Sequence, residues 1–284
     1  MSIPARLNPM GTPRKIPLTF RAEQANSTVT LNAVGSPTVS GLMYRAHSTG
    51  SWQTYTAGTT ITLADVGDTV QFWNSANALS SSSSNYVNFA MTGTVSAHGD
   101  ALSLLDFSDT VPSSGLYRLF NGCTALVSAP RLSAKTLNNS SYYALFNGCT
   151  SLTAPPELPA TILGAGCYYT MFYSCTSLET PPELPATSLK SQCYSRMFQN
   201  CTSLTYAPFL PAAALASDCY KQMFASCSSL SSVEVAFTAW ADSVNATENW
   251  LLNVAADGTF KMPSALTEIR DASHIPSGWT IVNS

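Results

Sequence analysis

The sequence contains few charged residues. Lys, Arg, Asp and Glu together make up 10% of the 284 residues, against about 25% in typical soluble domains. The formal net charge is -3, so the chain lacks the basic field that nucleic-acid binding needs, and no nucleic-acid partner is expected. The polar surface must consist mainly of Ser, Thr, Asn and Gln. Such a neutral surface suits secreted, cell-surface and virion proteins.

Long apolar runs are also missing. No stretch of about 18 apolar residues occurs, so the sequence predicts no membrane insertion. Residues 1–15 contain Pro4, Pro9 and Pro13 and no apolar core, so no signal peptide is expected in this chain. The expected location is a virion, reached through cell lysis, or the extracellular space or cell surface.

Catalytic and metal-binding patterns are scarce. The three histidines, His47, His98 and His274, lie in separate segments, and no Gly-rich phosphate loop or nucleophile elbow occurs. His98 and Asp100 stand close together in a predicted loop, where a solvated turn is favoured over a catalytic dyad. No histidine accompanies the cysteines and no Cys-x-x-Cys spacing occurs, so no metal and no cofactor are expected. We predict that the chain is not an enzyme.

What the sequence does contain is a 26-residue repeat in five copies. Chance cannot align so many residue types at one spacing without an insertion, and units of this size must stack to bury their apolar faces. The columns that define the predicted structural ladder are Phe120, Phe146, Phe172, Phe198 and Phe224, together with Cys123, Cys149, Cys175, Cys201 and Cys227. Leucine and proline columns, which include Leu126 and Pro130, follow the same step.

Within one unit the apolar spacing indicates a helix. Apolar residues stand at i, i+4, i+5, i+8 and i+9, which is one face of a helix; they are Leu163, Cys167, Tyr168, Met171 and Phe172. Gly122 and Gly148 fit a helix C-terminus in the first two units. The proline column must end a short strand, because proline cannot donate to a ladder. Each unit is therefore predicted to be one helix plus one short strand of a parallel sheet.

The unit also carries a family resemblance. It reads Cys-Tyr-x-x-Met-Phe-x-x-Cys-Thr-Ser-Leu from residue 167, followed by Pro-Pro-Glu-Leu-Pro-Ala-Thr from residue 181. This motif resembles the BspA-like leucine-rich repeat surface proteins of gut bacteria and their phages, over about residues 115–235. The segments 258–263 and 275–282 are similar to the closing part of many such proteins. The resemblance implies adhesion to host or matrix proteins, or a surface or phage protein without enzymatic activity.

The predicted fold class is α+β, with an N-terminal β-sandwich followed by a leucine-rich-repeat-type α/β solenoid with a C-terminal cap. Residues 18–100 form the sandwich, because short alternating segments are separated by turns up to about Met91. Residues 1–17 are an N-terminal extension, and 101–114 link the sandwich to the repeats. The five repeats occupy 115–233, and 234–284 form the cap.

The eight cysteines fall into two unequal columns. One has five members, and the other has three, Cys167, Cys193 and Cys219. Pairing within units or along columns would leave thiols without mates, so we predict buried, reduced cysteines that pack as small apolar side chains.

Variable positions beside the fixed columns indicate where a ligand would bind. An aromatic and acidic patch is predicted from Arg131, Glu179, Glu183, Tyr206 and Phe209. Phe209 could instead pack on the cap. Glu157 and Glu183 occupy equivalent positions and could mimic a catalytic carboxylate pair, although exposed repeat consensus is the favoured interpretation.

The leading hypothesis is a non-enzymatic recognition or adhesion protein, namely a phage virion protein on the tail or capsid that recognises the host. Its partners would be a host-surface protein or glycan, with other virion proteins as further candidates. The alternative is a bacterial cell-surface or secreted leucine-rich repeat adhesin. A third hypothesis, a glycan-acting enzyme, lacks any catalytic constellation in the sequence.

Overall fold

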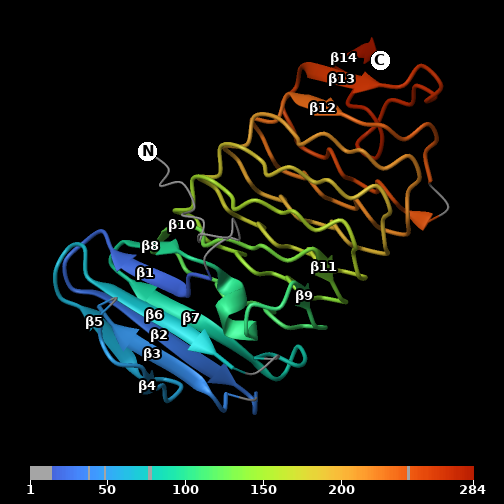
Figure 1. Cartoon of the computed structure of the whole chain (residues 1–284). Helices are drawn as coiled ribbons and strands as arrows, with labels where there is room; N and C mark the ends of the chain where they lie inside the picture. Colours follow the sequence, from blue (N-terminus) through green and yellow to red (C-terminus); the bar gives the residue numbers. More distant parts are fainter. Residues whose placement is uncertain (1–14, 38, 48, 76–78, 242–243) are drawn as a thin grey trace, which may run out of the picture.

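The structure is a computed structural model that describes residues 15–37, 39–47, 49–75, 79–241 and 244–284. N-terminal strands, stacked repeats and a C-terminal sheet follow one another along the molecule (Figure 1). Most of the predicted N-terminal extension, residues 1–17, lies outside the described residues. We number the repeats from their first residues, 115, 141, 167, 193 and 219.

The N-terminal strands form two sheets. The larger has the order β10-β8-β1-β6-β3-β4 and the smaller β5-β2-β7. Their members are β1 (Leu18–Ala22), β2 (Ser27–Val34), β3 (Leu42–Ala46), β4 (Gln53–Thr54), β5 (Thr60–Leu63), β6 (Thr69–Asn74), β7 (Tyr86–Thr92), β8 (Val95–His98) and β10 (Leu126–Ser128). The sheets pack face to face, because Phe20 of β1 and Phe89 of β7 contact each other with ring centroids 4.7 Å apart.

The prediction of an α+β fold with a helix-containing solenoid is wrong. The described residues contain no α-helix, and the 3₁₀ helix η1 (Ala101–Leu105) joins the N-terminal strands to the repeats. The chain is almost entirely strand and turn, arranged in several sheets without a closed solenoid. The segment of each repeat that was predicted as a helix is a run of consecutive turns, which we call the turn ribbon.

Hydrogen bonding in the turn ribbon alternates along the chain. In the third repeat the N–H groups of Tyr169, Met171 and Tyr173 each close a local turn by donating to the carbonyls of Gly166, Tyr168 and Thr170. The intervening N–H groups of Tyr168, Thr170 and Phe172 donate to carbonyls of the fourth repeat. Half of the ribbon's donors therefore close local turns, and the other half join neighbouring repeats.

The ribbon also places every fourth residue in the left-handed region. Gly166, Thr170 and Ser174 of one ribbon have φ values of 57°, 51° and 58°. The pattern recurs in every ribbon. Its other members are Ser114, Arg118, Gly122, Ser140, Ala144, Gly148, Gln192, Arg196, Asn200, Asp218, Gln222 and Ser226. The predicted C-terminal glycines of helices, Gly122 and Gly148, are thus the last left-handed residues of their ribbons, and they end no helix.

The period of four explains the wrong helix prediction. Cys167, Met171 and Cys175 are buried at steps of four, and so are Tyr168 and Phe172. An α-helix has about 3.6 residues per turn. Over two turns, the burial pattern of the ribbon, with its period of four, therefore differs only slightly from that of a helix. Apolar spacing alone does not separate them. The hydrogen bonds to the next repeat decide the outcome, because they satisfy amides that a helix would use internally.

The side of each repeat that carries the prolines is less regular. Strands here are β10, β11 (Thr136–Leu137), which pairs with β9 (Thr110–Val111), and β12 (Ser232–Glu234). Between β11 and β12 the described chain forms no strand, so the predicted parallel sheet across all repeats is absent. In the first four repeats the prolines that follow the leucine column lack the N–H that a ladder needs, and the fifth repeat, which has no proline there, forms β12.

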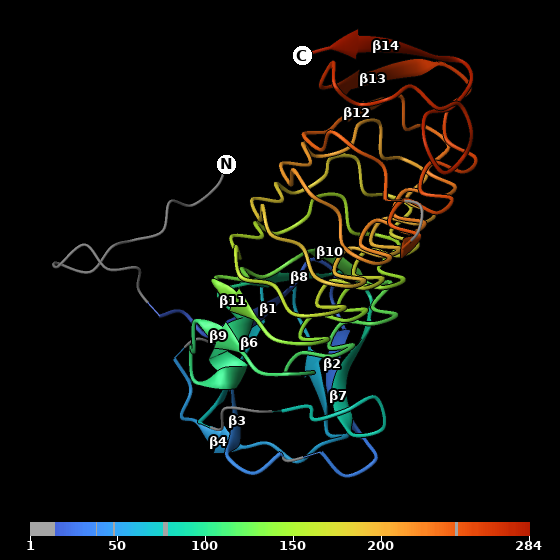
Figure 2. The same ribbon diagram turned by 90° about the vertical axis from the view of Figure 1, so that its right-hand side faces the viewer.

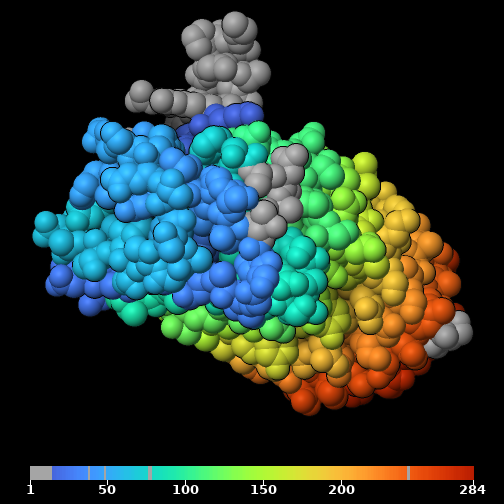
Figure 3. Space-filling model, turned by 90° about the horizontal axis from the view of Figure 1, so that it is seen from below, coloured from blue at the N-terminus to red at the C-terminus, as the bar shows by residue number. Residues whose placement is uncertain are grey.

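Aromatic stacks form the centre of the repeats. The rings of Phe120 and Phe146 are 5.2 Å apart and nearly parallel, at 3°. The stack continues through Phe172, Phe198 and Phe224 with centroid separations of 5.5 to 5.6 Å. At the N-terminal end Phe89 of β7 stacks on Phe120, and β8 pairs in parallel with β10 of the first repeat. The N-terminal strands and the repeats therefore share one core, and Figure 3 shows them as one continuous body.

The C-terminal segment closes the other end. β13 (Gly258–Met262) and β14 (Trp279–Asn283) extend β12 of the last repeat into a parallel sheet at the C-terminal end (Figure 2). Trp250, Phe260 and Trp279 are buried there. The segment around Trp250 is a sixth turn ribbon, with left-handed residues at Asn245, Asn249 and Asn253.

Candidate binding face

The proline segments of the second and third repeats border an open groove of about 510 Å³. Six prolines line it, together with two glutamates, two small or hydroxyl residues and one leucine. They are Pro155, Pro156, Pro159, Pro181, Pro182 and Pro185, with Glu157, Glu183, Ala154, Thr180 and Leu158. Proline has a fixed φ, so these walls are stiff and the groove is preformed. We call this side of the repeats the proline face.

Two carboxylates stand on the groove one repeat apart. Glu157 and Glu183 are both exposed, and neither forms an ion pair with any described residue. Like charges at equivalent positions on adjacent units repel each other. Groups held in this way would be stabilised by a cation from outside the chain.

The predicted binding residues spread along the proline face. Arg131, Glu157, Glu183 and Phe209 occupy one column in four successive repeats. Phe209 is 51% exposed, so about half of its side chain is open to a ligand. Tyr206 is 44% exposed and shortly precedes Phe209 in the same repeat.

Arg131 lies apart from the other predicted residues. Its backbone is bound at the N-terminal sheets, where its N–H donates to Gly99 and its carbonyl accepts from Ala101. Glu179 is exposed, and its N–H donates to Thr153 of the preceding repeat. Glu179, Glu183, Tyr206 and Phe209 thus fall on two adjacent repeats, and Arg131 on the first.

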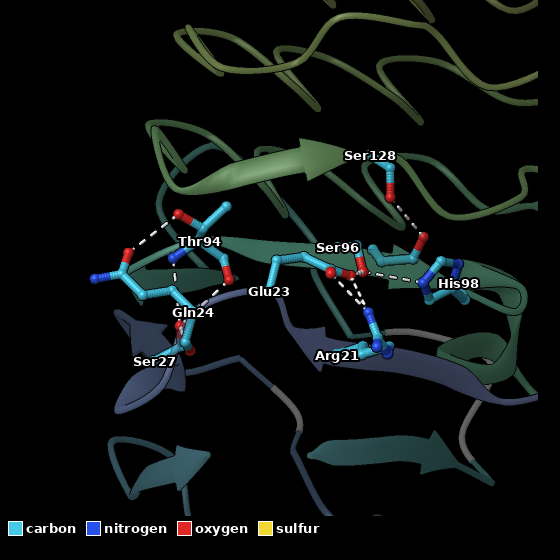
Figure 4. Close-up of polar contacts among 9 residues, drawn as sticks. Arg21, Glu23, Gln24, Ser27, Thr94, Ser96, His98 and Ser128 are labelled. Carbon is cyan, nitrogen blue, oxygen red and sulfur yellow. Dashed lines mark hydrogen bonds and ion pairs between the residues drawn. The ribbon is translucent and has the colours of Figure 1, made fainter. Parts of the chain in front are cut away.

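A polar cluster that the sequence did not indicate lies on β1 and β8, beside β10 (Figure 4). Arg21 Nη1 donates to both oxygens of Glu23, at 2.7 and 2.6 Å. Ser96 Oγ lies 2.5 Å from Glu23 Oε1 and 3.0 Å from His98 Nε2. The hydrogen bonds to Arg21, and next the one to Ser96, hold the pKa of Glu23 below its usual value.

The proton arrangement in this cluster does not activate a nucleophile. Glu23 is ionised and can only accept, so Ser96 gives its single proton to Glu23. His98 Nε2 must then donate to Ser96, which is the reverse of what a general base does. Burial lowers the pKa of His98, so the ring is neutral near pH 7. The cluster braces the sheet edge that joins the repeats.

The other histidines also have structural partners. Asp100, which the sequence placed near His98, instead accepts from the N–H of Leu102 and from Ser133 Oγ. His274 Nδ1 lies 2.8 Å from Asp271 Oδ1, and the ring packs edge-on against Trp240. Over the described ranges no group of three or more His, Cys, Asp or Glu side chains could hold a metal ion. Among the same residues, no helix has the length and apolar character needed to cross a membrane.

All eight cysteines are free and buried. The column of five has a polar role as well as a packing role. Cys149 Sγ donates to the carbonyl of Phe120 at 3.1 Å, and Cys175 donates in the same way to Phe146. Burial raises the pKa of Cys123 and Cys175 to about 12. These thiols are therefore inert hydrogen-bond donors between repeats.

Comparison with known proteins provides no relative. No family model matches the sequence, and searches of curated proteins and of solved structures find no significant match. The resemblance drawn from the repeat motif stays a prediction. Function must be argued from the surfaces of this chain.

Proposed function

We propose that the chain is a non-enzymatic recognition protein, and that its proline face binds a basic segment of a partner protein. The observation that carries this proposal is the groove between the second and third repeats, whose stiff proline walls hold two unpaired carboxylates. A preformed groove loses little conformational freedom when it binds. An extended segment with Lys or Arg side chains would offset the repulsion between Glu157 and Glu183.

The aromatic residues beyond the groove support the same reading. Tyr206 and Phe209 are exposed in the repeat that follows Glu179 and Glu183. Tyrosine is enriched among residues that dominate binding energy, and neighbouring apolar contacts exclude water from charged pairs. A basic segment lying along the repeat axis would meet the carboxylates first and the aromatic pair next.

The setting we propose is a phage virion, with the protein on the tail or capsid recognising the host. The composition, with few charges and an extensive Ser, Thr and Asn surface, suits an extracellular environment. A bacterial surface adhesin is the alternative. Mass spectrometry of purified virus particles, beside cell-envelope fractions, separates the two, because the virion proposal requires the chain at a fixed copy number in particles.

Binding is tested with an array of extended peptides of basic, neutral and acidic composition. The basic peptides should bind, and the double change Glu157→Gln and Glu183→Gln should weaken their binding about tenfold, since each lost charge pair near a surface is worth roughly 0.7 kcal/mol. Asp257→Asn, an exposed acid in the C-terminal segment, is the matched control. Equal binding of acidic peptides, or no effect of the double change, would contradict the proposal.

A further inference from the structure

A second ladder of aromatic residues lies on the turn ribbons and takes no part in the proline face. Tyr117, Tyr143 and Tyr169 occupy equivalent positions in the first three repeats, and their rings stack with centroids 4.9 Å apart at both steps. Tyr86 of β7 extends the ladder, because its ring meets Tyr117 edge-on at 5.4 Å. The N-terminal strands therefore contribute one end of this surface.

The middle and outer rings of the ladder are available to a ligand. Tyr86, Tyr143 and Tyr169 are partly exposed, whereas Tyr117 is buried, with 5% of its surface exposed. The Tyr117, Tyr143 and Tyr169 hydroxyls form no hydrogen bond with any residue that the structure describes. Burial raises the pKa of Tyr117 and Tyr143, so both stay neutral donors. The surface thus offers the phenol groups of Tyr143 and Tyr169, one in each of two adjacent repeats.

Two arginines accompany the ladder. The Arg118 guanidinium lies over Tyr117 and Tyr86, at 5.2 and 5.8 Å from the ring centroids. Stacking of this kind fixes the orientation of a planar guanidinium and prepares it for a carboxylate or sulfate. Arg196 occupies the equivalent position three repeats further on. At a rung spacing of about 4.8 Å the two charges are about 14 Å apart along the stack.

No acidic side chain of the described chain neutralises these arginines. The described ion pairs leave out both Arg118 and Arg196. The acids on the neighbouring ribbons, Asp218 and Glu248, are both held by Lys221, at 3.4 and 2.7 Å. The surface defined by Tyr86, Tyr117, Tyr143, Tyr169, Arg118 and Arg196, which we call the Tyr–Arg face, is therefore complementary to negative charge.

We infer that the Tyr–Arg face binds an acidic glycan chain laid along the repeat axis. Its hydroxyl groups bond the tyrosine hydroxyls repeat by repeat, and its carboxylate or sulfate groups pair with the two arginines. An acidic peptide fits less well. Ribbon N–H groups are consumed by turns and by bonds between repeats, so a peptide backbone would find few donors for its carbonyls.

The test measures binding of polygalacturonate oligosaccharides, heparin, neutral cello-oligosaccharides and oligoglutamate to the full chain by calorimetry. Polygalacturonate supplies carboxylates and heparin supplies sulfates, so the comparison identifies the anionic group. One of the two should bind, and neutral glycan and oligoglutamate should bind at least about tenfold more weakly. No binding of either acidic glycan, or equal binding of oligoglutamate or of neutral glycan, overturns the inference.

Variants assign the binding to this face. The triple change Tyr117→Phe, Tyr143→Phe and Tyr169→Phe keeps the ring stack and removes the hydroxyls, and Arg118→Gln with Arg196→Gln removes the charges. Each set should weaken the bound glycan about tenfold, with the melting temperature almost unchanged for the Phe set. Tyr44→Phe and Lys135→Gln, on other surfaces, are the controls and should bind normally. Equal loss in the controls, or full binding by both variant sets, contradicts the inference. Basic-peptide binding by these variants tests the proline face separately.

Discussion

Phe89 of the N-terminal β7 stacks on Phe120 of the first repeat, with centroids 5.5 Å apart and planes 13° from parallel. Phe89 N–H also donates to the carbonyl of Leu119, and Cys123 Sγ donates to the carbonyl of Phe89. These are the contacts that a preceding repeat would make. The β7 strand therefore acts as the repeat before the first, although its sequence lacks the motif.

The first prediction concerns the thiols. Native protein should react very slowly with a thiol reagent at pH 8, because all eight cysteines are buried and burial raises their pKa, to about 12 for Cys123, Cys175, Cys193 and Cys227. Guanidinium should release about eight reactive groups. Four disulfides, detected as fewer free thiols in denatured protein, would contradict the prediction.

Stability should also depend on alkaline pH. Unfolded thiols ionise near their ordinary pKa of 9.0, whereas burial raises the pKa of the folded thiols, to about 12 for Cys123 and Cys175 and to about 11 for Cys219. Between these values the unfolded state binds fewer protons, so the free energy of unfolding falls as pH rises. The buried Tyr168 and Tyr194, whose pKa values burial raises, act in the same direction. Thermal unfolding should give a constant melting temperature up to about pH 8 and a steady decrease above pH 9.

The left-handed positions can be tested with glycine. Gln192 has φ = 57° and an exposed side chain, and a left-handed conformation costs a non-glycine residue about 1 kcal/mol. Gln192→Gly should therefore raise the free energy of unfolding by up to about 1 kcal/mol. The control Ser191→Gly, at an exposed neighbour without positive φ, should lower it by about 0.5 to 1 kcal/mol. Both free energies are measured by denaturant unfolding. If Gln192→Gly and Ser191→Gly changed the free energy of unfolding in the same direction, the ribbon would not be strained at Gln192.

Removal of the C-terminal segment should destabilise the whole stack. Truncation after Val233 deletes Trp250, Phe260 and Trp279, which are buried at the end of the core. Each large side chain contributes about 1.5 to 3 kcal/mol when buried, and the sum is comparable with the stability of a domain. The truncated protein should aggregate or melt at a much lower temperature, whereas deletion of residues 1–15 should change little. A monomeric truncation product that melts within a few degrees of the full chain would contradict this view.

The last prediction is that no glycan or peptide substrate is hydrolysed. The carboxylates of Glu157 and Glu183 lie in an open groove, and Ser96 is oriented as a donor to Glu23. Activity on a broad substrate panel should equal that of a Glu157→Gln and Glu183→Gln variant. Turnover that disappears in this variant would establish a catalytic carboxylate pair.

The sequence was a good guide to the period and a poor guide to the backbone conformation. The 26-residue step located the Phe and Cys columns, and these side chains do stack in the core. The helix prediction failed because a period of four resembles 3.6 over so short a segment, and because hydrogen bonds to the next repeat are not encoded in any local pattern. The tertiary contacts overrode the local signal.

Surface features were predictable to different degrees. The exposed Tyr206 and Phe209 followed from repeat geometry, because variable positions beside fixed columns face outward. The ladder of Tyr117, Tyr143 and Tyr169 follows the same step as the Phe and Cys columns and could have been found. The cluster of Arg21, Glu23, Ser96 and His98 could not, since it depends on the antiparallel pairing of β1 with β8.

The turn ribbon also determines where the chain can change length. Tyr194 N–H donates to the carbonyl of Cys219, whereas the equivalent Tyr220 N–H donates to Ala246, which lies a single position beyond the regular step. The additional residue is accommodated outside the ribbon. The bonding between ribbons continues beyond it, because the Phe224 N–H donates to the carbonyl of Trp250. Insertions and deletions would therefore accumulate on the proline face, where few bonds join neighbouring units. Evolution could remodel the ligand-contacting surface there, or duplicate whole units, while the ribbon keeps every copy in register.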